Sequence, residues 1–165
     1  MSQHSLGEAL VGVFNRLFQA AEDTILCGGA AEPYYEPGAP SVIYFREDFY
    51  RSALHEVAHW CVAGPVRRGL PDYGYWYVPD GRNAEQQSAF CSVEVKPQAI
   101  EALFCEALDL TFAVSVDNLT VDANCPEITH FKAAVDRQIM RFRQQGLPDR
   151  ALRFKKALAL LAVER

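Results

Sequence analysis

Two histidines, His55 and His59, are the residues of this sequence whose type and spacing most clearly predict chemistry. They stand in the run HEVAHW, within a segment whose apolar pattern predicts a helix from Asp48 to about Ala63. Side chains four residues apart project from one face of a helix, so the two imidazoles can converge on one metal ion. Glu56 lies beside them, about a third of a turn away. The run therefore predicts a metal site next to a carboxylate.

Two histidines leave a metal ion under-coordinated, and we expect a carboxylate as the third ligand. Glu94 is preferred to Glu85 and Glu101 because it lies in an otherwise uncharged stretch, where an unpaired carboxylate would be costly to bury. Pro97 follows three residues later and would distort the helical turn that carries Glu94, since it removes a hydrogen bond. Two alternatives stay open: Glu94 is an exposed helix residue, or both histidines only satisfy core groups.

The types of ligand do not identify the metal ion. Two histidines and a carboxylate around open positions suit zinc in a peptidase, where Glu56 would be the general base that takes a proton from metal-bound water. The same ligands suit ferrous iron in an oxygenase, and they also suit a structural metal site without activity. The sequence has no HxD pair of the kind that iron oxygenases using 2-oxoglutarate commonly carry, so we expect no 2-oxoglutarate.

Length and charge exclude several classes of protein. A chain of 165 residues, half of them hydrophobic, suits a single domain spanning residues 1–165. The net charge of −5, without a long basic run, argues against direct binding of nucleic acid. Arg67 and Arg68, after the motif helix, would face an acidic partner protein or complement the helix C-terminus. We expect a monomer.

The sequence also predicts where the protein resides. No apolar stretch is long enough to span a bilayer, and the N-terminal segment is interrupted by charged residues, unlike a signal peptide. The five cysteines include no CxxC pair, which fits a reducing compartment. We therefore expect a cytoplasmic protein without a membrane partner.

Before and after the motif helix, the pattern predicts short stretches of sheet. Amphipathic spacing predicts a first helix from Ser5 to about Glu22, and the glycines and prolines from Gly28 to Pro37 predict an irregular loop. The apolar run from Val42 to Phe45 predicts a strand. The aromatic run from Tyr73 to Val78 predicts another strand, closed by a turn at 79–81.

The rest of the pattern is helical. A helix from about Asn83 meets Pro97, which either kinks it or starts a fresh helix through Leu108. Two further helices carry the apolar residues of 128–142 and 152–161, and the short break between them predicts antiparallel packing. The expected fold class is α+β, mostly helical, with a short sheet next to the motif helix.

Several separated runs together resemble the elongation factor P hydroxylase family. They are HEVAHWCVAG, DYGYWYVPDGR at 72–82, VEVKPQAIEALFC at 93–105, and VDNL at 116–119. The resemblance extends more loosely from about Glu32 to Leu161 and is weakest in the N-terminal helix and at the C-terminal end. It implies a small zincin-like domain that hydroxylates the β-lysyl-modified lysine of elongation factor P.

The resemblance also implies roles for the motif residues. His55, His59 and Glu94 would bind Fe(II), with zinc as the alternative, and dioxygen would be the co-substrate. Glu56 would then no longer activate water; it would relay a proton, order the ligands or contact the substrate amine. Elongation factor P would be the protein partner.

A lysine substrate suggests which other side chains bind it. Tyr75 and Tyr77 would form an aromatic wall for the aliphatic stem and the ammonium group. Asp80 and Arg82 follow them at the turn, and Asp80 or Asp117 would pair with the positive charge of the amine. Plain packing of the aromatic residues and turn formation by the aspartates are the alternatives.

Overall fold

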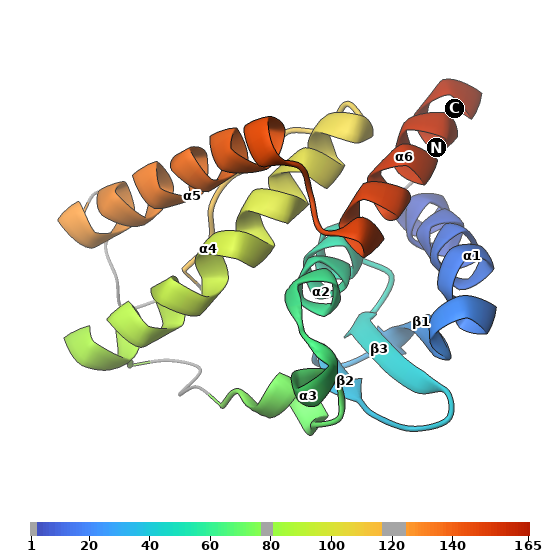
Figure 1. Ribbon diagram of the computed structural model, residues 1–165, viewed down its shortest axis with the longest axis horizontal. Helices are drawn as coiled ribbons and strands as arrows, with labels where there is room; N and C mark the ends of the chain where they lie inside the picture. The colour runs from blue at the N-terminus through green and yellow to red at the C-terminus, as the bar shows by residue number, and fades with distance from the viewer. Residues whose placement is uncertain (1–2, 77–80, 117–124) are drawn as a thin grey trace.

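A computed structural model gives the fold and describes residues 3–76, 81–116 and 125–165. Its strands are β1 (Thr24–Ala30), β2 (Tyr34–Glu36) and β3 (Ser41–Arg46). Its helices are α1 (Gln3–Glu22), α2 (Tyr50–Val62), α3 (Pro65–Arg68), the short 3-10 helix η1 (Pro71–Gly74), α4 (Ala84–Ala107), α5 (Pro126–Gln145) and α6 (Asp149–Glu164). The expected α+β class, mostly helical with a short sheet beside the motif helix, is confirmed (Figure 1).

The sheet has the order β1-β3-β2, with β1 parallel and β2 antiparallel to β3. β3 confirms the strand predicted at 42–45, but the loop predicted from Gly28 to Pro37 is wrong over β2 and the end of β1. Gly28 and Gly29 lie at a register shift inside β1. A Cβ on Gly28 would come within 2.7 Å of the carbonyl oxygen of Glu47, so the glycine permits a close backbone approach within a strand.

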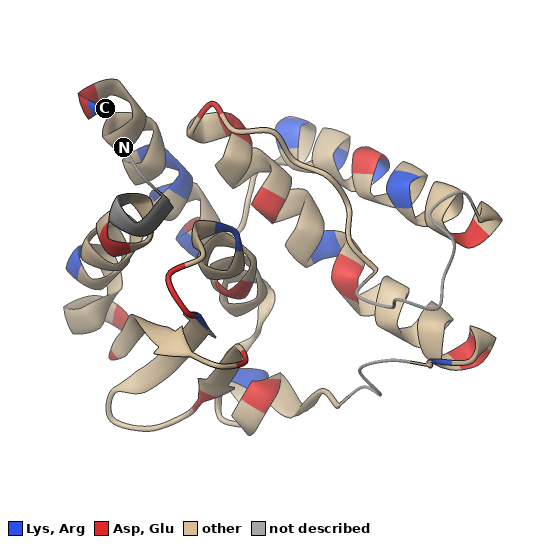
Figure 2. Cartoon of the chain, turned by 180° about the vertical axis from the view of Figure 1, so that it is seen from behind, with Lys and Arg blue, Asp and Glu red and all other residues tan. Residues whose placement is uncertain are grey.

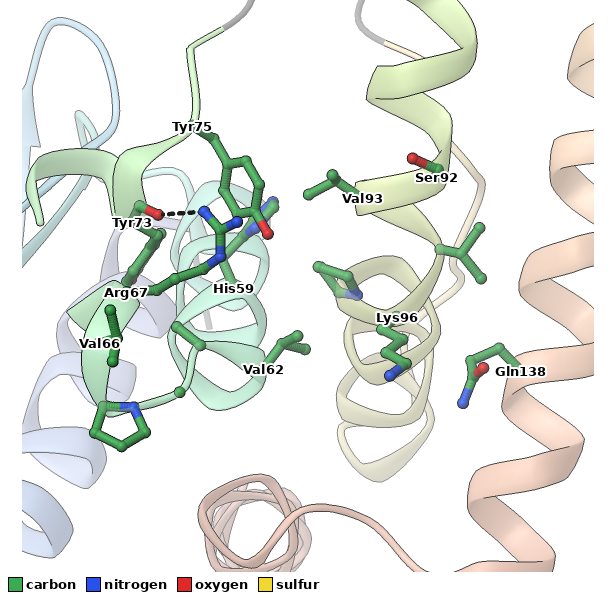
Figure 3. Close-up of a pocket in the computed structure, with 15 residues that line it drawn as sticks. His59, Val62, Val66, Arg67, Tyr73, Tyr75, Ser92, Val93, Lys96 and Gln138 are labelled. Carbon is green, nitrogen blue, oxygen red and sulfur yellow. Dashed lines mark hydrogen bonds between the residues drawn. The ribbon is translucent and has the colours of Figure 1, made fainter.

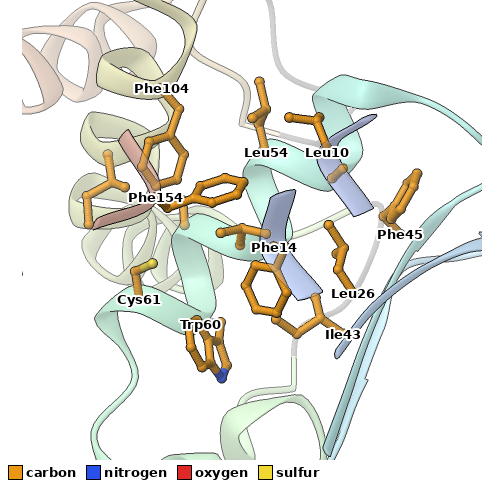
Figure 4. Close-up of a cluster of buried hydrophobic side chains, with 14 of the residues drawn as sticks. Leu10, Phe14, Leu26, Ile43, Phe45, Leu54, Trp60, Cys61, Phe104 and Phe154 are labelled. Atoms are coloured by element: carbon orange, nitrogen blue, oxygen red, sulfur yellow. The ribbon is translucent and has the colours of Figure 1, made fainter. Parts of the chain in front are cut away.

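Helix α2 lies at the centre of the molecule, and α1, β3, α4 and α6 pack around it (Figure 1). Its buried side chains recur at helical spacing and are Tyr50, Ala53, Leu54, Val57, Ala58, Trp60 and Cys61. The ring of Trp60 lies 5.1 Å from that of Phe14 (Figure 4). It lies 4.9 Å from the ring of Phe18, also on α1. This core fixes the motif helix on one side and leaves its histidine face to α4.

Helix α4 runs unbroken through Pro97, so the alternative of a fresh helix starting there is wrong. It begins at a capping box in which the side chain of Asn83 accepts from the backbone N–H of Gln86, while the side chain of Gln86 accepts from that of Asn83. Its charged residues are Glu85, Glu94, Lys96, Glu101 and Glu106 (Figure 2). No helix in the described part of the chain is long and apolar enough to cross a membrane.

Helices α5 and α6 both pack on α4, and the antiparallel pairing predicted between them is wrong (Figure 1). The apolar faces of the two helices pack into different hydrophobic clusters. Phe131 and Val135 of α5 cluster with Ala99 of α4, whereas Phe154 and Leu158 of α6 enter the main core. The short connection limits the distance between the helix ends, but it does not decide which surface each helix covers.

Residues 73–76 do not form the strand predicted from Tyr73 to Val78, and residues 77 and 78 lie outside the described residues. Asp72 and Tyr73 instead have positive φ angles of 46° and 60° within η1. The turn is held by tertiary contacts, because the Asp72 carboxylate accepts a 2.8 Å hydrogen bond from the Tyr35 backbone N–H and the rings of Tyr73 and Tyr35 stack at 4.4 Å. Aromatic residues favour strands in general, but here packing overrides that propensity.

We expect truncation of Phe154 to Ala to lower the free energy of unfolding by about 3–5 kcal/mol, because it leaves a cavity in the main core. The ring is fully buried, 5.1 Å from that of Phe104 and 5.9 Å from that of Phe14. Urea unfolding measures the loss. Leu160→Ala, on the same helix and 68% exposed, is the control and should change stability by less than about 0.5 kcal/mol. Equal effects of the two variants would contradict the assigned core.

Candidate metal centre

The packing of α4 on α2 brings Glu94 to the two histidines of the motif. The Nε2 atoms of His55 and His59 are 3.2 Å apart. Glu94 Oε1 lies 2.7 Å from Nε2 of His59, and Oε2 lies 3.6 Å from Nε2 of His55. The one ligand atom that each residue offers lies within 4.8 Å of the other two. The three residues predicted from the sequence therefore converge on one point.

This geometry fits a divalent metal ion. Ligand atoms about 2.0–2.2 Å from one ion, at angles between octahedral and tetrahedral, lie about 3–3.5 Å apart. The separation of 3.2 Å between the two histidine nitrogens falls in that range. Glu94 is only 4% exposed, and a carboxylate so buried requires positive charge nearby. His55, His59 and Glu94 can hold a metal ion and leave other coordination positions open.

Gln98 orients the carboxylate of Glu94. Its side-chain N–H donates to Glu94 Oε2 at 3.0 Å and also to the backbone oxygen of Ser115 at 2.5 Å. Its side-chain oxygen accepts from the backbone N–H of Ser115 at 3.0 Å. The buried amide thus has fixed partners on both sides, which sets the orientation of the ligand carboxylate.

Glu101 orients His55. The Nδ1–H of His55 donates to Glu101 Oε2 at 2.8 Å, which leaves Nε2 directed at the metal position. Sequence reasoning considered Glu101 only as a competing ligand and missed this role. A signal was present, because positions 94, 98 and 101 recur at the i, i+4, i+7 spacing of one helix face.

The carboxylates around the histidines change the proton affinities of the metal-free site. Burial alone lowers the pKa of His55, but the hydrogen bond to Glu101 and the charges of Glu94, Glu101 and Glu56 outweigh it and raise that pKa to about 10. Burial would raise the pKa of Glu94, yet the nearby His59 and His55 lower it to about 2. Without a metal ion, the site therefore holds a protonated His55 beside an ionised Glu94.

Glu56 lies on the wall of a cavity that opens at the candidate metal centre. The cavity has a volume of about 300 Å³, and His59 and Glu94 also line it. Burial raises the pKa of Glu56, the two histidines lower it, and the charges of Glu94 and Asp72 raise it further. A carboxylate next to the open side of the metal centre can accept a hydrogen bond from a bound molecule.

The other walls of this cavity are mostly aromatic. They are formed by Pro33, Asp72, Tyr73, Tyr75, Trp76, Arg82 and Phe90. Tyr75 and Arg82, two of the residues expected to bind the substrate, line this cavity, while Tyr77, Asp80 and Asp117 lie outside the described residues. Asp72 was not among the predicted site residues. It reaches the cavity through the positive-φ turn of η1, which no sequence pattern had indicated.

Arg82 forms structural contacts at the edge of the cavity. It is buried, and its guanidinium donates to the Gln87 side chain at 3.0 Å and to the backbone oxygen of Val116 at 2.6 Å. The guanidinium also lies 4.0 Å over the ring of Phe90. These contacts tie the start of α4 to the segment near Val116, so Arg82 supports the wall on which Phe90 lies.

A helix that carries HEVAH, a carboxylate from a second helix and an adjoining cavity together form a candidate metal site of the HExxH type. The family model described as elongation factor P hydroxylase matches residues 13–162. A relative from Haemophilus influenzae, described as elongation factor P lysine hydroxylase, is 45% identical over 160 residues, which cover 94% of this chain and 88% of that protein. The chain belongs to the elongation factor P hydroxylase family, as the motif resemblance implied.

We expect Glu94→Gln to lower the bound metal at least tenfold, because the change removes the charge that balances the ion. Glu85→Gln, an exposed glutamate of the same helix, should leave binding unchanged. Titration of the metal-free protein with Zn²⁺ or Fe²⁺, followed by elemental analysis, measures the difference. Full binding by Glu94→Gln would exclude Glu94 as a ligand.

Metal binding should release a proton near neutral pH, because the pKa of His55 is raised to about 10 and its Nε2 must be deprotonated to bind. Affinity should therefore rise about tenfold per pH unit from pH 7 to 9. Calorimetry in two buffers with different ionisation enthalpies counts the released protons. Glu101→Gln should bind about 10–100-fold more weakly and should release fewer protons, since His55 loses its acceptor charge. A pH-independent affinity would contradict this electrostatic picture.

Proposed function

We propose that this protein is an iron-dependent hydroxylase that adds one oxygen atom to the modified lysine of elongation factor P, using dioxygen as co-substrate. The supporting observation is a cluster of two histidines and one carboxylate beside an aromatic and acidic cavity, in a chain of the elongation factor P hydroxylase family. The relative from Haemophilus influenzae carries the description of a lysine hydroxylase of that factor. We further propose that residues 1–165 act as one catalytic unit.

His55, His59 and Glu94 would hold the iron. A ferrous ion with open positions supplies the redox chemistry by which dioxygen oxidises a C–H bond, and the donor set of two imidazoles and a carboxylate suits that ion. Insertion of one oxygen atom into a C–H bond, with the other reduced to water, consumes two electrons and two protons from an external reductant. Glu101 and Gln98 would keep His55 and Glu94 oriented throughout the reaction.

The cavity beside the metal centre suits a lysine side chain. Tyr75, Trp76 and Phe90 offer apolar surface to an aliphatic stem, and an aromatic wall also favours a cation. The carboxylates of Glu56 and Asp72 lie in the same cavity and can accept hydrogen bonds from an ammonium group. We propose that Glu56 contacts the substrate amine and so places the neighbouring C–H bond at the metal centre.

The zinc-peptidase alternative, with Glu56 as general base, is not favoured, because the relative is described as a lysine hydroxylase. The ligand set by itself does not separate the two reactions. The substrate is a translation factor, and we therefore propose that the protein acts in the cytoplasm. We also propose that it acts as a monomer, without direct binding of nucleic acid.

The function is tested by mass spectrometry of lysyl-modified elongation factor P. With ferrous iron, dioxygen and a reductant, the protein should increase the mass of the factor by one oxygen atom. His55→Ala should abolish the shift and Glu85→Gln should retain it. Asp72→Asn keeps the oxygen that accepts from Tyr35 but removes the charge, so it should raise KM several-fold. An unchanged mass with iron-loaded protein, or peptide cleavage that is lost in Glu56→Gln, would overturn the proposal.

A further inference from the structure

A second groove opens beside the metal centre, and we propose that it binds an acidic surface of the substrate protein next to the target lysine. This inference rests on the proposed function and identifies how the same site recognises its partner. The groove has a volume of about 710 Å³. Figure 3 shows it between the end of α2 with α3 and Tyr75 on one side, and α4 with α5 on the other.

The groove meets the cavity that we propose to bind the substrate lysine, here called the lysine cavity, at the candidate metal centre. His59, Tyr73 and Tyr75 line both of them. A protein surface that occupies the groove is therefore adjacent to the cavity, and a side chain that projects from it into the cavity lies beside His59.

The groove and the lysine cavity carry opposite charges. Arg67 and Lys96 line the groove, and Arg141 lines an adjoining hollow of about 300 Å³ that shares Val62, Lys96 and Gln138 with it. The described lining of the groove and of the adjoining hollow includes no aspartate or glutamate. The lysine cavity is lined by three carboxylates, Glu56, Asp72 and Glu94, and by one arginine, Arg82. A positively charged side chain on an acidic surface complements this distribution.

The groove is positive although the chain carries a net charge of −5. Lys96 is the one cation of α4, whose other charged residues are glutamates (Figure 2). Both Lys96 and Arg141 are exposed, and neither forms an ion pair within the described part of the chain. Their charges therefore remain available to carboxylates of a partner.

Arg67 is held in a fixed position beside the groove. Its guanidinium lies 3.9 Å over the Tyr75 ring and donates to the backbone oxygen of Tyr73 at 2.9 Å. A guanidinium has five N–H donors, so donors beyond the one used there can bind a carboxylate. An arginine that is already ordered loses less conformational entropy on binding.

Exposed apolar side chains lie among these cations. Val62 and Val66 line the groove and are 36% and 81% exposed. Apolar contacts next to arginine are typical of protein interfaces. A nucleic acid would need many phosphate contacts for its affinity, and the three cations here supply few. The observations thus favour an acidic protein surface over a nucleic acid.

The test reverses the groove charges in the iron-loaded protein. The double variant Lys96→Glu/Arg141→Glu should raise KM for full-length modified elongation factor P about tenfold, leave kcat within about twofold, and flatten the rise of KM with salt. The control Lys132→Glu/Lys156→Glu changes the net charge equally at exposed residues that line none of these hollows, and it should leave KM within about twofold. A short peptide carrying the same modified lysine should show no difference between the variants.

Direct binding of the factor by interferometry separates this inference from the proposed function. If the wild-type protein binds the factor but does not hydroxylate it, the proposed function fails, and tenfold weaker binding by the groove variant still supports the groove. Equal KM and equal binding for the groove and control variants would overturn the inference. An effect of the groove variant on kcat alone would also overturn it. The same holds if RNA inhibits the wild-type protein but not the groove variant, while KM for the factor is unchanged.

Discussion

The buried carboxylate of Glu94 is the interaction on which the rest of the site depends. A charge that is 4% exposed is stable only with positive charge and hydrogen bonds around it, and His55, His59 and Gln98 supply them. This requirement couples two helices, since α2 carries the histidines and α4 carries Glu94 with its supporting residues. The large aromatic core behind α2 keeps that helix in place while its other face meets α4.

The second constraint is the turn at Asp72 and Tyr73. Both residues have left-handed backbone angles, which are unfavourable for residues other than glycine and persist only where the surroundings hold them. The Asp72 hydrogen bond to Tyr35 and the stacking of Tyr73 on Tyr35 provide that support. The turn places Tyr73 beside His59, with ring centroids 6.5 Å apart, where both residues line the acidic cavity and the basic groove.

Much of the site followed from the sequence, because its determinants are local. The HEVAHW spacing places two imidazoles on one helix face, and an isolated glutamate in an apolar stretch of α4 identified Glu94. Helical periodicity predicted the long helices, and a short apolar run predicted the strand β3. Family membership added the activity, which the ligands themselves leave open between zinc and iron chemistry.

The tertiary structure decided those features of the site and the fold that depend on residues far apart in the chain. Glu101 orients His55 only because α4 crosses α2 at one register, and the sequence shows the helix face but not the partner of that face. The segment 71–76 has aromatic residues typical of a strand, yet stacking on β2 makes it a turn. Likewise α5 and α6 separate onto different surfaces of α4 because their apolar faces fill different clusters. The sequence by itself therefore determined which helix face carries the two candidate metal-binding histidines, and the packing of distant elements determined the supporting residues, the cavity and the groove around them.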